Sequence, residues 1–252
     1  MQAKPLLAYF GHHKCATQWI RRIVTDICKI IDREPLVFNG RKQFGGDLLA
    51  SIPRASSTFL CYMNADVKYV RPLGRLAHGF RGFHIVRDPR DVVVSTYYSH
   101  LYSHPLFEGL EQQRAKLKSV SKDEGLMLVL ENRRHQFRTM LEWDYNRPNV
   151  LELRMENVTS DAAAEIPRIL EFLGLGPADG ITPTLLREIV AGHDFSVLAR
   201  RNPGEEDVTS HYRKGVKGDW MNHFGPGHVA YFKEHYGDLL KKLRYENDDN
   251  WG

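Results

Sequence analysis

The chain has 252 residues, of which 42% are hydrophobic and 26% charged, and its formal net charge is +4. This composition is ordinary for a soluble globular protein, and the mild basic excess suits an anionic ligand as well as weak nucleic-acid contact. No apolar run approaches a membrane span, and the N-terminus lacks the layout of a signal peptide, so we expect a cytoplasmic protein without a transmembrane segment. Three irregularly spaced cysteines and 12 scattered histidines predict neither a disulfide framework nor a metal site.

Taken in chain order, apolar runs of strand length alternate with segments of helical spacing. The runs predict strands at 6–10, 36–38, 58–63, 81–86 and 150–153. The helical spacing predicts helices at 17–30, 45–52, 89–98, 122–145, 161–173 and 228–243. Two segments lack an apolar period: residues 101–120 predict a mobile surface loop, and residues 192–218 a long loop that is functional or disordered.

This alternation predicts an α/β fold with a central parallel sheet flanked by helices, as one domain over residues 1–252. Ligands of such folds bind at the carboxyl ends of the strands. The first strand, 6–10, runs into a tight turn and then into the helix that begins at Thr17. A helix N-terminus offers unpaired N–H groups and a positive dipole end, so this P-loop-like strand-loop-helix predicts a phosphate seat with Lys14 beside it.

Three segments together resemble the sulfotransferase family that uses 3′-phosphoadenosine 5′-phosphosulfate (PAPS). The first, His13-Lys14-Cys15-Ala16-Thr17-Gln18-Trp19, is similar to that family's P-K-S-G-T-T-W loop for the 5′-phosphosulfate. The second, Arg87-Asp88-Pro89-Arg90-Asp91-Val92-Val93-Val94-Ser95-Thr96-Tyr97-Tyr98, resembles its 3′-phosphate segment. The third, Tyr212-Arg213-Lys214-Gly215-Val216-Lys217-Gly218-Asp219-Trp220-Met221-Asn222-His223-Phe224, resembles its R-K-G-x-x-G-D-W-K-N-H-F signature.

The resemblance implies which residues hold the donor. The 5′-phosphosulfate would be held by Lys14, Cys15, Ala16, Thr17, Gln18 and Trp19. The 3′-phosphate would be held by Arg87, Ser95, Arg213, Lys214 and Gly215. The resemblance further implies that Trp19 and Phe195 stack on the two faces of the adenine, and that no metal is needed.

The chain departs from the family pattern at several positions. Ala16 stands where the family has glycine, which predicts a loop that avoids a strongly positive φ or absorbs some strain. Cys15 and Gln18 replace Ser and Thr, and Met155 stands where many relatives have a tyrosine facing the adenine. The acceptor-side histidine of the family's K-T-H segment has no counterpart after the strand at 58–63.

We therefore expect a sulfotransferase that moves a sulfuryl group from PAPS to a hydroxyl, or less readily an amine, and releases PAP. Its acceptor would be a small molecule, a lipid or a carbohydrate, with no nucleic acid as partner; the oligomeric state is not predicted. Two alternatives stay open: a P-loop nucleotide kinase, and a nucleotide-binding module of the same fold without catalysis. Lys14 would stabilise the departing group, and the general base would be Asp66 first and His12 second, with Glu34, His100 and His104 as weaker candidates.

Overall fold

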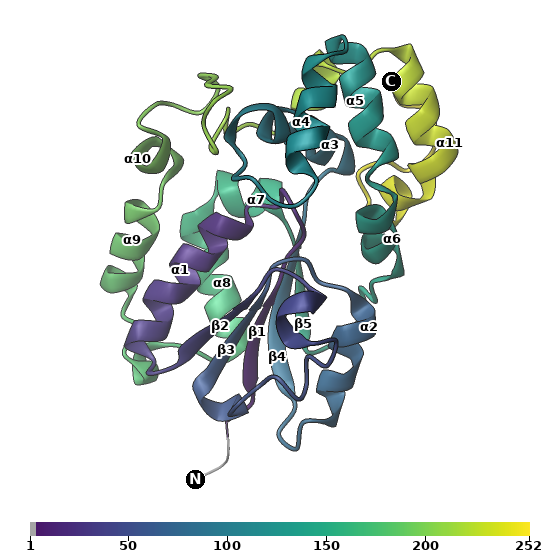
Figure 1. Cartoon of the computed structure of the whole chain (residues 1–252). Coiled ribbons are helices and arrows are strands. Elements are labelled where there is room, and N and C mark those ends of the chain that lie inside the picture. The colour runs from purple at the N-terminus through teal and green to yellow at the C-terminus, as the bar shows by residue number, and fades with distance from the viewer. Residues whose placement is uncertain (1–3) are drawn as a thin grey trace. The chain divides into compact units, whose positions relative to one another are not determined.

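The computed structural model describes residues 4–252, which divide into two compact units (Figure 1). The first unit contains the residues up to 86 together with 142–194, and the second contains 87–141 and 195–252. The single domain expected over residues 1–252 stays a prediction. Within the described residues no helix is both long enough and apolar enough to cross a membrane.

The first unit is built on a five-stranded parallel sheet in the order β2-β3-β1-β4-β5. Its strands are β1 (Leu6–Phe10), β2 (Glu34–Phe38), β3 (Thr58–Tyr62), β4 (Phe80–Val86) and β5 (Val150–Arg154). Every residue of β1 and β3 is buried, which is why these strands read as continuous apolar runs. The five predicted strands and the parallel sheet are confirmed.

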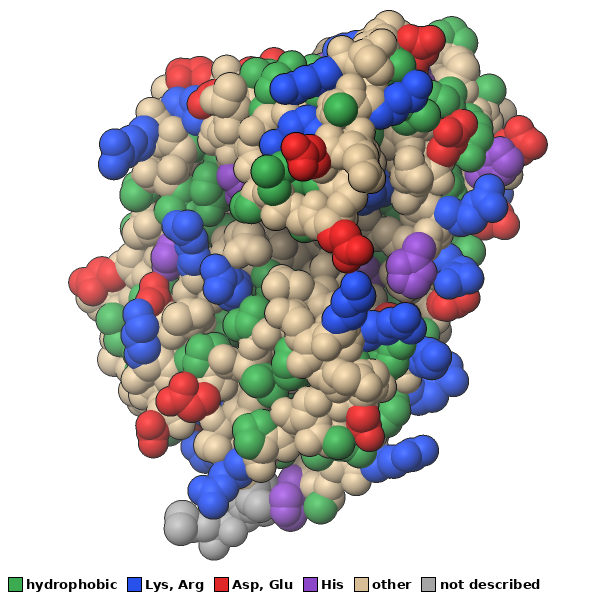
Figure 2. All heavy atoms as spheres, in the orientation of Figure 1, with side chains coloured by type: hydrophobic (Ala, Val, Ile, Leu, Met, Phe, Trp, Pro, Cys, Tyr) green, Lys and Arg blue, Asp and Glu red, His purple; other side chains and the backbone are tan. Residues whose placement is uncertain are grey.

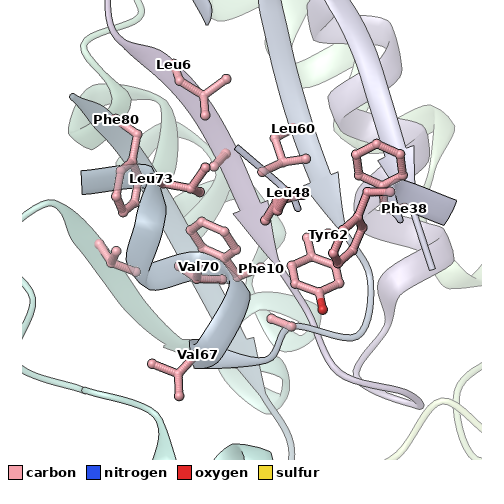
Figure 3. Close-up of a cluster of buried hydrophobic side chains, with 14 of the residues drawn as sticks. Leu6, Phe10, Phe38, Leu48, Leu60, Tyr62, Val67, Val70, Leu73 and Phe80 are labelled. Atoms are coloured by element: carbon pink, nitrogen blue, oxygen red, sulfur yellow. The ribbon is translucent and has the colours of Figure 1, made fainter. Parts of the chain in front are cut away.

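Helices cover both faces of this sheet. On one face, apolar side chains of α1 (Thr17–Ile30) and α8 (Ala162–Leu173) pack against Phe59 of β3 and Phe83 of β4. On the other face, Phe10 lies in a cluster with Val70 of the short helix α2 (Val67–Val70) (Figure 3). The remaining helices of this unit are α7 (Met155–Ser160) and α9 (Pro183–Gly192), with 3-10 turns at Arg41–Phe44, Ala55–Ser57, Arg71–Arg75 and Pro177–Asp179.

Strand β1 lies at the point where the connections change direction. The chain leaves β1 through α1 toward β2 and β3 on one side, and β4 and β5 lie on the other side. The carboxyl end of a strand at such a switch point is where open α/β sheets bind ligands. Residues 11–16, which follow β1, lie at this position.

The second unit is helical. It contains α3 (Pro89–Tyr98), a π-helical turn Ser99–Ser103, α4 (Leu110–Lys118), α5 (Lys122–Glu131), α6 (Arg134–Glu142), α10 (Phe195–Ala199), a 3-10 turn Asp219–Asn222 and α11 (Pro226–Lys242). Gly125 of α5 lies against the Tyr97 ring of α3, where an added Cβ would come 2.7 Å from a ring carbon. A glycine inside this helix therefore allows α3 and α5 to approach closely.

Four of the predicted elements differ from the structure, one of them the loop expected at 192–218, which contains α10 (Phe195–Ala199). The loop expected at 101–120 is interrupted by α4 (Leu110–Lys118), on which Leu110 and Leu117 lie seven positions apart and are both buried; residues 104–109 have no regular structure. The single helix expected at 122–145 is two, since α5 ends at Glu131 and is capped by Asn132, whose side-chain amide donates to the Leu128 carbonyl. Residues 45–52 form turns instead of a helix, and Gly45 and Gly46 both have positive φ.

Candidate functional site

The loop after β1 is closed by backbone hydrogen bonds. Gly11 donates to the Tyr62 carbonyl at 2.9 Å, and its own carbonyl accepts the N–H of Ala65 at 2.8 Å. The N–H of Cys15 donates back to the His12 carbonyl at 3.1 Å. These bonds fix the loop against the end of β3.

Two residues of this loop have left-handed backbone conformations without being glycine. Lys14 has φ 68° and Ala16 has φ 55°. Of the two alternatives predicted for Ala16, the structure has the strained one. Left-handed conformations cost an L-residue with a Cβ roughly 1–2 kcal/mol, and such strain often lies at functional sites.

Ala16 is also the N-cap residue of α1, and its side chain offers no hydrogen-bond acceptor. The first N–H groups of a helix have no partner within the helix. No acidic residue lies in the first turn of α1 either. The loop therefore presents a helix N-terminus suited to an external anion, with Lys14 two residues before the cap.

The other predicted residues of this segment lie on both sides of the loop. Cys15 is buried, whereas Thr17 and Gln18 are half-buried at the start of α1. Trp19 is 9% exposed, and its indole N–H donates to the carbonyl of His193 at 2.7 Å. His193 follows α9 and hydrogen-bonds Asp26 of α1, so this bond fixes the orientation of the indole.

Asp66 and His12, the two candidate bases, have different surroundings. Asp66 is the N-cap of α2, and its carboxylate accepts the N–H of Lys68 at 2.8 Å. His12 is 1% exposed, and its Nε2 lies 2.8 Å from Nε2 of His84. Burial, followed by the proximity of His84, holds the pKa of His12 well below its usual value.

Sequence reasoning missed the two residues behind His12. His84 lies in β4 and is fully buried, and its Nδ1 is 2.6 Å from a carboxylate oxygen of Glu152 in β5. The indole N–H of Trp143 donates to the other oxygen of Glu152 at 2.8 Å. A polar residue inside each of two apolar runs was the available signal, because buried polar groups in strands need partners.

In the second unit, α3 carries the residues of the predicted 3′-phosphate segment. Asp88 caps the helix by accepting the N–H of Arg90 at 2.9 Å, and Ser95 is half-buried. Arg87 is 9% exposed, and its guanidinium lies 3.9 Å from Asp91. Asp91 is 1% exposed, and burial raises its pKa although Arg87 opposes this.

Asp219 gathers the basic residues of the third segment. Its carboxylate pairs with Arg213 and, at 2.7 Å, with Lys214; the side chain of Asn222 donates to it at 3.0 Å. Burial alone would raise the pKa of Asp219, but these hydrogen bonds outweigh burial and hold the pKa well below its usual value. Arg213 also pairs with Glu206, so both predicted cations are already engaged by carboxylates.

Phe195 packs directly on Gly215. An added Cβ on Gly215 would come 2.6 Å from the Phe195 ring, and Gly215 has φ 68°. Both facts require glycine at this position. The structure therefore brings together four predicted residues of this unit: Phe195, Arg213, Lys214 and Gly215.

Two surface and side-chain features bear on which ligands the described residues could bind. Residues 4–252 contain no group of three or more His, Cys, Asp or Glu side chains placed to hold a metal ion. On the face drawn in Figure 2, Lys and Arg side chains are interspersed with Asp and Glu. Met155, at the start of α7, is half-buried.

A family model and several known proteins match this chain. The model of the sulfotransferase domain family matches residues 81–244, which include the Arg87 and Arg213 segments but not the loop after β1. Sulfotransferase 2A6 of Mus musculus is 28% identical over 168 residues, covering 62% of this chain and 55% of that protein. Sulfotransferase 1 family member D1 of Rattus norvegicus is 27% identical over 177 residues, covering 64% and 54%. The matches thus span about half the length of these relatives.

Two solved structures share the fold. Mouse sulfotransferase SULT7A1 complexed with PAP superposes with a TM-score of 0.62 at 19% identity, covering 97% of this chain and 86% of that one. Retinol dehydratase in complex with androsterone and the inactive cofactor PAP gives a TM-score of 0.55 at 16% identity, covering 96% and 82%. Since the sulfotransferase domain model matches well over half of the residues, this chain belongs to the sulfotransferase family.

Proposed function

We propose that the chain transfers a sulfuryl group from PAPS to a hydroxyl of a small-molecule acceptor and releases PAP. The observation that carries this proposal is the uncapped N-terminus of α1, which stands behind Lys14 at the switch point of the sheet in a member of the sulfotransferase family. Sulfuryl transfer is an in-line displacement, in which catalysis consists mainly of positioning and of stabilising developing negative charge.

The loop after β1 is assigned to the 5′-phosphosulfate. Backbone N–H groups of residues 16–18 would hold the phosphate oxygens, which suits a loop whose side chains at Cys15 and Gln18 differ from the family's hydroxyls. Lys14 would neutralise the bridging oxygen while its bond to sulfur breaks. Trp19 would contact the adenine, with its indole orientation already fixed by the bond to His193.

The 3′-phosphate is assigned to Arg87, Ser95, Arg213, Lys214 and the N–H of Gly215. A phosphate binds guanidinium groups through pairs of parallel hydrogen bonds, so two arginines and a lysine supply a strong donor set. Phe195, packed on Gly215, would contact the adenine. These assignments extend the resemblance that the sequence motifs carry.

His12 is the better candidate for the general base. The Asp66 carboxylate is used as a helix cap, whereas His12 follows the central strand two residues before Lys14. Its depressed pKa keeps the imidazole neutral at physiological pH, which is the form that accepts a proton. Asp66→Asn should therefore retain turnover, whereas His12→Gln should lose it and still bind PAP.

Titration calorimetry with PAP, 5′-AMP and ATP, followed by transfer from radiolabelled PAPS to a panel of phenols, alcohols, lipids and sugars, tests the function. We expect PAP to bind more tightly than both other nucleotides, and at least one hydroxyl acceptor to become labelled. Preference for ATP would indicate the P-loop kinase, which the family match does not favour. Tight PAP binding without transfer or donor hydrolysis would indicate the non-catalytic module.

The acceptor class and the location are finer proposals. A small-molecule, lipid or carbohydrate hydroxyl is the expected acceptor, an amine a less favoured one, and no nucleic acid is expected to be a partner. The cytoplasmic location expected from the sequence is tested by fractionating cells that express the tagged chain.

A further inference from the structure

Three polar side chains lie in a row on one face of the sheet in the first unit. In the parallel register Phe10 of β1 pairs with His84 of β4, and His84 pairs with Glu152 of β5. Side chains two positions apart in a strand share a face, so His12, just past the end of β1, lies on the same face as Phe10. Three neighbouring positions thus align His12, His84 and Glu152.

Hydrogen bonds join these three side chains into one network. Nε2 of His12 lies 2.8 Å from Nε2 of His84, and Nδ1 of His84 lies 2.6 Å from Glu152. The Trp143 ring stacks on His84 with 4.1 Å between centroids, while its N–H holds the second oxygen of Glu152. His84 therefore has no rotational freedom, because it is packed on one face and bonded at both ring nitrogens.

The direction of each bond follows from its acceptor. A carboxylate only accepts, so Nδ1 of His84 carries a proton and donates it to Glu152. In a neutral His84 the Nε2 atom is then an acceptor, and Nε2 of His12 must carry the proton between the two rings. A neutral His12 with its proton on Nε2 has its lone pair on Nδ1.

We infer that Glu152 and His84 are positioning residues that fix the tautomer of His12, so that Nδ1 of His12 is the nitrogen that accepts the acceptor's proton. This inference rests on the proposed function for its catalytic part. The acceptor O–H bond breaks as its proton passes to Nδ1, and the oxygen forms a bond to sulfur. The bond from sulfur to the bridging oxygen breaks, and its electron pair leaves with the 5′-phosphate of PAP.

The same hydrogen-bond network stabilises His12 after it has accepted the proton. Once protonated on Nδ1, His12 is a cation, and its Nε2–H donates more strongly to His84, which Glu152 supports from behind. Tyr145 also lies near His84, at 5.7 Å between ring centroids, and burial raises its pKa so that it stays neutral. Arg147 lies over the Trp143 ring, 5.5 Å from its centroid.

Glu152→Gln should reverse the donor–acceptor direction of the hydrogen bonds that join Glu152, His84 and His12. A glutamine can turn its amide N–H₂ toward Nδ1 of His84, which then accepts, so that the His84 proton lies on Nε2 and is donated to His12. The proton of His12 then lies on Nδ1 and blocks the base. We expect turnover to fall on the order of 10²–10⁴-fold, as when a carboxylate that orients a catalytic histidine is neutralised, with unchanged PAP affinity. The matched control is Glu188→Gln, an exposed carboxylate on α9.

Nitrogen-15 NMR of histidine-labelled protein reads the tautomer directly and needs no activity. In the wild type we expect an unprotonated Nδ1 and a protonated Nε2 for His12, and the reverse in Glu152→Gln. A wild-type His12 protonated on Nδ1, as a doubly protonated His84 would impose, overturns the inference even if Glu152→Gln fails to fold. If the protein has the expected tautomers but transfers no sulfuryl group, the tautomer assignment holds and the proposed function is overturned.

Discussion

Asp91 of α3 accepts the backbone N–H of Gly218 at 2.8 Å with one carboxylate oxygen, and its other oxygen accepts the N–H of Trp220 at 2.9 Å. The second and third family-like segments, more than 100 positions apart in the chain, are thereby joined inside one unit. A carboxylate near the start of α3 thus holds the backbone that carries Asp219.

Replacing Asp91 by Asn should loosen this connection. The amide offers one acceptor where two N–H groups need one each, so we expect a loss of about 1–3 kcal/mol in the free energy of unfolding. Urea unfolding measures the loss, and amide exchange should quicken at Gly218 and Trp220. Asp238→Asn on α11, whose side chain is 86% exposed, should change neither quantity.

Replacing Ala16 by Gly should relieve the strain of the loop after β1. Because φ is 55° at this position, we expect a gain of about 1 kcal/mol in stability, measured by thermal or urea unfolding. The same change at Ala163, an exposed residue in the first turn of α8, should lower stability. A stability loss in Ala16→Gly comparable to the Ala163 loss would contradict the strain.

Lys14→Ala should slow turnover on the order of 10²–10³-fold, by analogy with the removal of an oxyanion-hole donor, and should weaken PAP binding far less. Steady-state rates and calorimetry separate the two effects. Lys29→Ala, which removes an exposed lysine near the end of α1, serves as the control. Wild-type turnover in Lys14→Ala would refute the role of Lys14.

Arg87→Ala should remove discrimination between nucleotides. A hydrogen bond to a charged group contributes about 1.5–3 kcal/mol, so binding of PAP should weaken by that amount more than binding of 5′-AMP, which lacks the 3′-phosphate. Calorimetry with both ligands gives the difference. Equal weakening of both nucleotides would place the phosphate elsewhere, and Arg168→Ala on α8 should affect neither.

Acid should destabilise the fold through His12. Its folded-state pKa lies well below the usual value of about 6.5, so below that pH the unfolded chain binds a proton that the folded chain does not. Stability is therefore fully present above about pH 6.5 and falls as the pH drops toward the folded pKa. Urea unfolding across pH should show a shallower fall in His12→Gln, whereas the exposed His135→Gln should follow the wild type.

The strands and the first helix were predictable because their apolar residues are continuous or regularly spaced. Helix α4 was not, since only Leu110 and Leu117 are buried and the positions between them hold polar residues and one exposed alanine. Nor does periodicity predict the end of α5 at Glu131, because apolar residues continue into α6.

At the candidate site, the sequence motifs predicted the residues that would bind the two phosphates. In the structure the predicted residues of the third segment lie close together. The hydrogen bonds that join His12, His84 and Glu152 could not be predicted. They depend on the register of β1, β4 and β5, which a sequence alone does not specify. Asp219 is visible in the signature, but its engagement of Arg213 and Lys214 is a tertiary property.

The ion pairs of Asp219 with Arg213 and Lys214 affect how readily an external anion binds to these cations. Arg213 and Lys214 already pair with a buried carboxylate, so a 3′-phosphate that bound there, as we propose, would exchange one anionic partner for another. The net gain in free energy is then the difference between the old and the new ion pairs, so it is smaller than the gain from a phosphate that binds unpaired cations. We expect a nucleotide held in this way to dissociate readily, so that the spent donor leaves and the next one enters.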